Sequence, residues 1–247
     1  MNQTIKDLFL ENWVTYFPGA ELPIVLSYAD ETVPLRASRP ESDSHCLICH
    51  LAPVRQGATR YFDADTTRCG GARNYLGFET ERSSTFPHFL SCGIPGEIEG
   101  ERYKRSPELA VQYMESQPTF KAPGRAAVFK RWDNLAEQDS PEVVIFFATA
   151  DVLSGLFTLA NFDEVDPQGV IAPFGSGCSS IVYHPYLELQ SKHPRAVIGM
   201  FDISARPCVA SDVLSFAVPW PKFVSMVEQM EESFLITSSW HQVRSRL

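Results

Sequence analysis

The sequence predicts an α+β (mixed α/β) fold in a single compact domain spanning residues 1–247. Short runs of β-branched and aromatic residues alternate with helical patterns in the C-terminal half. The N-terminal half is irregular and rich in cysteine, and neither an internal repeat nor a low-complexity segment divides the chain. Together these observations predict a sheet of mostly buried strands with helices packed on it.

Few regular elements are expected at the beginning of the chain. Apolar residues recur with helical spacing between Ile5 and Tyr16, which predicts a first helix. Leu22–Tyr28 has the composition of a strand. Two prolines and many small polar residues then predict a loop over residues 31–44, and a short strand follows within residues 59–65.

A clear helix start lies further along the irregular half. Ser106 is a suitable N-cap residue, Pro107 fits the first helical position, and Glu108 fits the first turn, where a negative charge is favourable. Gly and Pro recur too often just before this point to predict regular structure there.

The C-terminal half carries the predicted sheet. The apolar runs Val143–Phe147, Ala196–Phe201 and Leu214–Val218 should be strands of one sheet, since short apolar strands satisfy their backbone groups only by pairing. Helices are expected over Val152–Asn161 and Lys222–Ser233, where the apolar residues lie on one face. Both helices should pack on this sheet.

Charge and hydropathy exclude several classes of partner. The net charge of −9 and pI of about 5.2 argue against a nucleic-acid partner, because phosphate backbones are repelled. The longest apolar runs are too short to cross a bilayer, and charged residues within the first helical pattern exclude a secretory h-region. We therefore expect a cytoplasmic protein without a membrane partner.

The stretch HCLICH, from His45 to His50, holds two cysteines separated by two residues. This pattern is compatible with c-type haem attachment, a zinc knuckle, part of an iron–sulfur site, a redox dithiol or core packing. Haem attachment normally follows export, for which the sequence carries no signal. The strand-to-helix context of a thioredoxin-type dithiol is also missing. His45 and His50 are possible substitute ligands.

A metal or iron–sulfur site is the leading interpretation of the cysteines. Cys46 and Cys49 form a local pair, and Cys69 and Cys178 are the proposed remote ligands. Zinc ribbons usually repeat the C-x-x-C pair, whereas a cluster accepts a pair plus single cysteines that meet in space. Glycines adjoin Cys69, Cys92 and Cys178, which would let the backbone approach a cluster closely. Alternatively, these cysteines are small buried hydrophobes.

A second hypothesis is a thiol-dependent enzyme or a domain that binds a small anion. Glycines before Cys178 could expose backbone N–H groups that lower its pKa, with His184 or His193 as the base. Asp202 and Arg206 follow a predicted strand, where ligand contacts often lie. A third possibility is a structural or interaction protein.

Several motifs together resemble the uncharacterised domain-of-unknown-function family 169, also called the archaeal conserved region family. The similarity runs from about Trp13 to Ser239. It is carried by HCLICHLAPVRQG, RCGGARNYLGF, GIPGEIEGERYKRSPELA, VVIFFATADVLSGLFTLANF, PFGSGCSSIV and VIGMFDISARPCVASDVLSFAVPW. The family is prokaryotic and common in anaerobes. The resemblance therefore implies a cytoplasmic setting that is compatible with oxygen-sensitive centres. It implies no established activity, substrate or cofactor.

The resemblance also selects among the cysteines. Cys92 stands where the family pattern does not lead us to expect cysteine. The positions that match the recurring cysteine motifs are Cys46, Cys49, Cys69, Cys178 and Cys208.

The leading hypothesis is an iron–sulfur cluster, or zinc, in a redox or sensing protein with a redox partner. We expect the ligands to line one pocket, with Cys208 in reserve. The expected ligands are Cys46, Cys49, Cys69 and Cys178. The sequence identifies neither a reaction nor a substrate.

Overall fold

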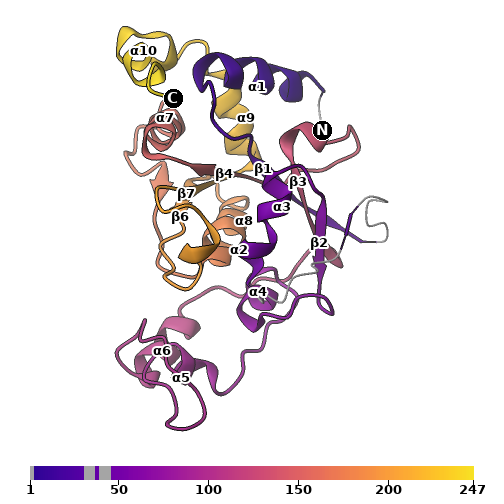
Figure 1. Ribbon diagram of the computed structural model, residues 1–247, viewed down its shortest axis with the longest axis vertical. Helices are drawn as coiled ribbons and strands as arrows, with labels where there is room; N and C mark the ends of the chain where they lie inside the picture. Colours follow the sequence, from indigo (N-terminus) through magenta and orange to yellow (C-terminus); the bar gives the residue numbers. More distant parts are fainter. Residues whose placement is uncertain (1–2, 31–36, 39–45) are drawn as a thin grey trace.

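The computed structural model describes residues 3–30, 37–38 and 46–247 (Figure 1). Most of the predicted loop over residues 31–44 therefore lies outside the described residues, as does His45. In the described part of the chain, the helices are too short or too polar to cross a membrane.

One seven-stranded sheet forms the centre of the protein, with the strand order β2-β3-β1-β4-β7-β6-β5. Every pair of neighbours is antiparallel except β5 and β6, which are parallel. The strands are β1 (Ile24–Ala29), β2 (Arg60–Asp63), β3 (Ala126–Arg131), β4 (Val143–Ala148), β5 (Val170–Ile171), β6 (Ala196–Gly199) and β7 (Leu214–Pro219).

The central strand β4 is buried on both faces of the sheet, which explains its continuous apolar sequence. Side chains alternate along a strand, so Val144 and Phe146 join one hydrophobic core. Ile145 and Phe147 join a second core on the opposite face. The sheet therefore separates two independent apolar layers.

In the described part of the chain, helices cover both faces of the sheet in two groups (Figure 1). The first group is α1 (Gln3–Tyr16), α7 (Ala150–Ala160), α9 (Trp220–Glu228) and α10 (Ser238–Arg244). The second group is α2 (Leu47–His50), α3 (Ala52–Arg55), α4 (Gly70–Tyr75) and α8 (His184–Glu188), together with the π-helical turn η2 (Ser179–Tyr183). The cysteine-rich segments belong to this second face.

Residues 78–121 leave the second face as an excursion that we call the flap. It contains α5 (Phe86–Phe89) and α6 (Pro107–Glu115), which lie away from the sheet in Figure 1. The two ends of the flap meet at a neck, where the Ala122 N–H donates to the Gly77 carbonyl at 2.9 Å. As predicted, the Ser106 hydroxyl caps α6 by accepting from the Leu109 N–H.

The mixed α/β fold is confirmed, and the three predicted apolar runs lie in one sheet as β4, β6 and β7. Their exact extents differ from the prediction. Strand β6 ends at Gly199 because Met200 has a φ of 67°, which turns the chain and leaves Phe201 exposed. Likewise α9 ends at Glu228, five residues before the predicted Ser233.

Candidate functional site

Cys46 and Cys49 lie on the first turn of α2. Cys46 is the N-cap residue, with extended backbone angles, and Cys49 follows three residues later. Residues at this spacing lie on the same face of a helix. The intervening Leu47 and Ile48 are buried in the second core and fix the turn against the sheet.

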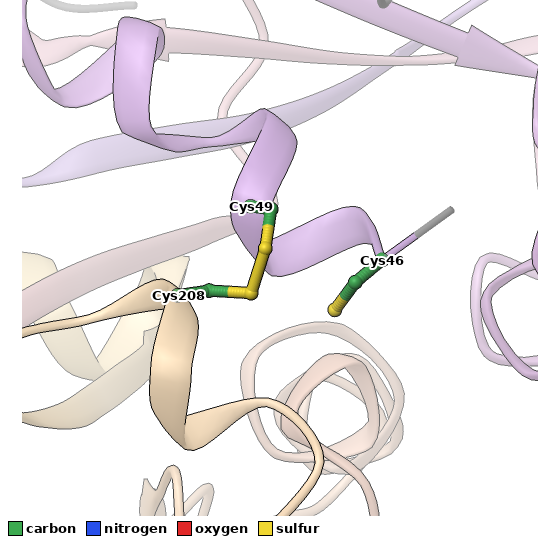
Figure 2. A group of neighbouring side chains, drawn as sticks. All are labelled: Cys46, Cys49 and Cys208. Atoms are coloured by element: carbon green, nitrogen blue, oxygen red, sulfur yellow. A yellow bond between two sulfur atoms is a disulfide. The ribbon is translucent and has the colours of Figure 1, made fainter. Parts of the chain in front are cut away.

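Cys49 is joined to Cys208 by a disulfide, which links two segments 159 residues apart in sequence (Figure 2). Cys208 comes from the short helix η3 (Arg206–Cys208), beyond the end of β6. The sulfur of Cys46 lies beside this bond, and the three sulfurs are all within 4.8 Å of one another. We call Cys46, Cys49 and Cys208 the sulfur triad.

Cys69 and Cys178 approach the same region from other segments. Cys69 is the N-cap of α4, and its sulfur accepts from the Ala72 N–H at 3.5 Å. Cys178 immediately precedes η2, with its sulfur 3.1 Å from the Ser176 hydroxyl. Both lie outside the sulfur triad.

Cys46, Cys69 and Cys178 line one cavity of about 350 Å³. Its remaining walls are mostly apolar and aromatic, and they come from the flap and from the body of the protein. Cys92 is exposed and lines a different pocket, so it takes no part in this arrangement. Five of the six cysteines therefore gather at this cavity or directly behind its wall.

Close packing of the GSGC loop brings Cys178 to the cavity. A Cβ atom at Gly177 would lie 2.9 Å from Ile48 and 3.0 Å from Ala205, too close for ordinary contact. Gly177 is thus required where the loop passes between α2 and the segment after β6. In contrast, a Cβ atom at Gly70 or Gly71, next to Cys69, would meet no close neighbour. The packing of the protein itself therefore does not require glycine at these two positions.

The environment of the cavity thiols favours their neutral form. Burial raises the pKa of Cys178 far above its ordinary value, and the neighbouring Cys69, Cys46 and Asp202 raise it further. Burial also raises the pKa of Cys46, although hydrogen bonds from the backbone of α2 partly oppose this shift. Neither thiol has the lowered pKa of an activated nucleophile.

Asp202 is occupied by hydrogen bonds within the protein. One carboxylate oxygen accepts from the Gly177 N–H at 2.9 Å. The other accepts from the Tyr103 hydroxyl and from both the backbone N–H and the hydroxyl of Ser204. Asp202 therefore joins the GSGC loop, the flap and the segment after β6, and its acceptor sites are largely used.

Arg206 has an equally structural position. Its guanidinium donates to the carbonyls of Met200, Ala210, Ser211 and Val213, which closes the loop between β6 and β7. These bonds place Cys208 beside α2. Because its donors are turned to the backbone, the structure does not favour Arg206 as an anion-binding residue.

Neither histidine predicted as the base is placed to act on Cys178. Burial lowers the pKa of His184 to about 4, and neither His184 nor the exposed His193 lines the cavity. His50 packs near the ring of Phe62, with ring centroids 6.1 Å apart, and is likewise absent from the cavity wall. Among the described residues, the geometry therefore gives no support to a pair formed by Cys178 with His184 or His193.

The structure brings together some of the predicted metal ligands and not others. Cys46, Cys69 and Cys178 meet at one cavity, but Cys49 is bonded to Cys208 and is not available as a ligand in this state. Cys208, predicted only as a reserve ligand, belongs to the compact group. Sequence reasoning missed the aromatic walls of the cavity, which come from residues that are far apart in sequence.

Comparison with known protein families identifies the family of this chain. The profile of DUF169, described as uncharacterised ArCR, matches residues 22–229. The chain belongs to this family. The match to DUF169 covers the sheet, the flap and all six cysteines. No curated protein and no solved structure shows a significant match to the chain.

Proposed function

We propose that this DUF169 protein holds a thiolate-bound metal centre, an iron–sulfur cluster or a single zinc ion, when the Cys49–Cys208 disulfide is reduced. The observation that carries the proposal is the gathering of five cysteines from four separate segments: Cys46, Cys69 and Cys178 line the cavity, and Cys49 and Cys208 lie within 4.8 Å of Cys46. Burial alone gives no reason for cysteines to gather in this way. Cys92, in the same chain, is exposed and lies away from the other five cysteines.

The donor set fits a thiophilic metal. Thiolates select zinc and iron–sulfur clusters over hard cations such as Mg²⁺. Four thiolates about 2.3 Å from a zinc ion lie about 3.8 Å apart, and the triad sulfurs are already within 4.8 Å of one another. Cys46, Cys49 and Cys208 would be the first three ligands. Cys178 or Cys69, from the adjacent cavity wall, would be the fourth.

Redox state would control access to this centre. A dithiol reductant supplies two electrons and two protons, which break the Cys49–Cys208 bond and leave two thiols, while the reductant becomes a disulfide. A reducing compartment such as the cytoplasm would favour this state. A cysteine loses its thiol proton when it binds a metal. Metal affinity should therefore rise with pH.

The proposed role is redox sensing: an oxidised dithiol partner takes two electrons from Cys49 and Cys208 and is itself reduced to two thiols, while the Cys49–Cys208 bond forms and the metal is released. The test is anaerobic reconstitution of the reduced protein with iron and sulfide, and separately with zinc. We expect about one cluster or one zinc ion per chain, measured by metal and sulfide analysis, with thiolate-to-iron absorption for the cluster. Formation of the disulfide before reconstitution should abolish the binding.

Serine variants of the cysteines supply the control. Cys46→Ser, Cys49→Ser and Cys208→Ser should each lose the metal, and Cys92→Ser should retain it. A loss in only one of Cys69→Ser and Cys178→Ser would identify the fourth ligand. Colourless, metal-free protein from an anaerobic, reduced preparation would contradict the proposal, as would equal metal content in Cys46→Ser and Cys92→Ser.

A further inference from the structure

The cavity has a second property that the cysteines do not explain. Its walls bring aromatic side chains of the flap against aromatic side chains of the body. The flap contributes Phe86, Phe89, Tyr103 and Tyr113, and the body contributes Tyr75, Phe174 and Phe201. Aromatic rings supply large, rigid contact surfaces of the kind that commonly line small-molecule sites.

Polar contacts hold the flap over the cavity without filling it. The Tyr113 hydroxyl donates to the Phe174 carbonyl at 3.0 Å, and the Tyr103 hydroxyl donates to Asp202 at 3.2 Å. The ammonium group of Lys104 lies 4.2 Å from the ring centroids of both Tyr113 and Phe174. These contacts, together with the neck at Gly77 and Ala122, fix the spacing between the two aromatic walls.

Large apolar side chains are exposed around the same cavity. Ile203 is 71% exposed, Phe174 is 55% exposed and Phe201 is 54% exposed, and all three line the cavity. Phe89 on the flap is exposed to a lesser degree. Exposed apolar residues are common singly, but their concentration around one concave site marks a binding surface.

The described residues that line the cavity offer no free charged group to an ionised ligand. Among the described residues that line the cavity, Asp202 is the only Asp, Glu, Lys or Arg, and its oxygens already accept four hydrogen bonds. Burial raises the pKa values of Tyr75, Tyr103 and Tyr113, so these hydroxyls stay neutral near pH 7. The Lys104 ammonium lies against two aromatic rings of the cavity wall and is not itself one of the lining residues. An ionised ligand would therefore lose hydration here without a free charged group in the described wall to replace it.

We infer that the cavity binds a small, uncharged, planar aromatic molecule, held between the flap and the body beside the cysteine wall. The volume of about 350 Å³ lies within the range of small-molecule sites, roughly 300–1,000 Å³. A site enclosed from two sides by rings suits a compact planar ligand better than a helix or a strand of another protein. This inference does not depend on metal binding.

The test uses the neutral naphthalene dye 6-propionyl-2-(dimethylamino)naphthalene as the probe. We expect saturable binding at one site per chain, with a blue shift in its emission. The anionic dye 8-anilinonaphthalene-1-sulfonate should bind at least tenfold more weakly. Ile203→Asp places a charge at the cavity and should weaken binding of the neutral dye at least tenfold.

Ile236→Asp is the matched control, because Ile236 is 62% exposed and does not line the cavity. It should change the dissociation constant less than twofold, and urea unfolding should verify that both variants fold. Unsaturable dye binding, equal effects of the two variants, or stronger binding of the anionic dye would overturn the inference.

A different occupant would also be detected. Sedimentation equilibrium would show whether the protein forms a dimer. If Ile203→Asp dissociates such a dimer and Ile236→Asp does not, a second copy of the chain occupies the cavity, and the small-molecule inference is overturned. Ile203→Asp retains all six cysteines. Its metal content should therefore match that of the wild type, so failure of this inference is distinguishable from failure of the proposed metal site.

Discussion

Reduction of the Cys49–Cys208 disulfide should lower the free energy of unfolding by several kcal/mol. The bond joins residues 159 positions apart, so it constrains most of the unfolded chain. The chain-entropy relation gives about 5 kcal/mol for a loop of this length, and native disulfides typically contribute about 2–4 kcal/mol. We therefore expect a loss of about 2–5 kcal/mol. At a urea slope of about 3 kcal/mol/M, the unfolding midpoint should fall by about 0.7–1.7 M.

Urea unfolding followed by tryptophan fluorescence measures this change, with a chelator present to keep metal out of the comparison. The wild type is compared in its oxidised form and after reduction with a phosphine. The double variant Cys49→Ser/Cys208→Ser should have one midpoint, independent of reductant, while Cys92→Ser should keep the full shift. An identical midpoint for oxidised and reduced wild type would refute the reasoning, because the bond would then not constrain the unfolded chain.

Other consequences concern single residues. Arg206→Met should lower the unfolding free energy by about 2–3 kcal/mol, since it leaves backbone carbonyls without their donor, and an unchanged urea midpoint would contradict this structural role. Cys178 should react with iodoacetamide at least tenfold more slowly than the exposed Cys92, because burial shields its thiol and raises its pKa. Mass spectrometry of the alkylated protein measures both rates, and equal rates would contradict this prediction. The pKa of His184 is about 4 when folded and 6.5 ordinarily, so the unfolded state binds more protons between these values and stability should fall as the pH is lowered from 6.5 to 4. His184→Gln should flatten this part of the pH profile of the urea midpoint, and parallel profiles would count against the assignment.

The central part of the fold was predictable from sequence because its strands are buried on both faces. The run Val143–Phe147 is continuously apolar, and it forms most of the central strand β4. Strand β3 was not predicted. Its sequence, Ala126–Arg131, combines two alanines with two basic residues, and Lys130 is buried only because it pairs with Asp139 at 2.7 Å. The hydropathy of the local sequence does not predict that ion pair.

The candidate site shows a similar division. The C-x-x-C spacing places Cys46 and Cys49 on one helix turn, and this local consequence is readable from sequence. The choice of Cys208 as the partner of Cys49 depends on how Arg206 closes the loop after β6. Six cysteines allow 15 complete pairings, so sequence spacing alone does not select this one.

The aromatic cavity was the least predictable feature. Its two walls are brought together by the neck between Gly77 and Ala122 and by the bond from Tyr103 to Asp202. The Gly-rich and Pro-rich flap sequence gave little indication of regular structure, and its aromatic residues have no periodic spacing. Such a site becomes visible only when segments far apart in sequence are placed in space.

The number of sulfur atoms around the bound metal tests the central claim most directly. X-ray absorption spectroscopy at the metal edge, on reduced protein loaded anaerobically with iron and sulfide or with zinc, measures this number. For zinc, the proposal predicts four sulfur ligands at about 2.3 Å. For iron, it predicts sulfur ligands together with the iron–iron distances of a cluster. A first shell of mainly nitrogen or oxygen atoms, or spectra unchanged by Cys46→Ser, would contradict a metal centre built from the converging cysteines.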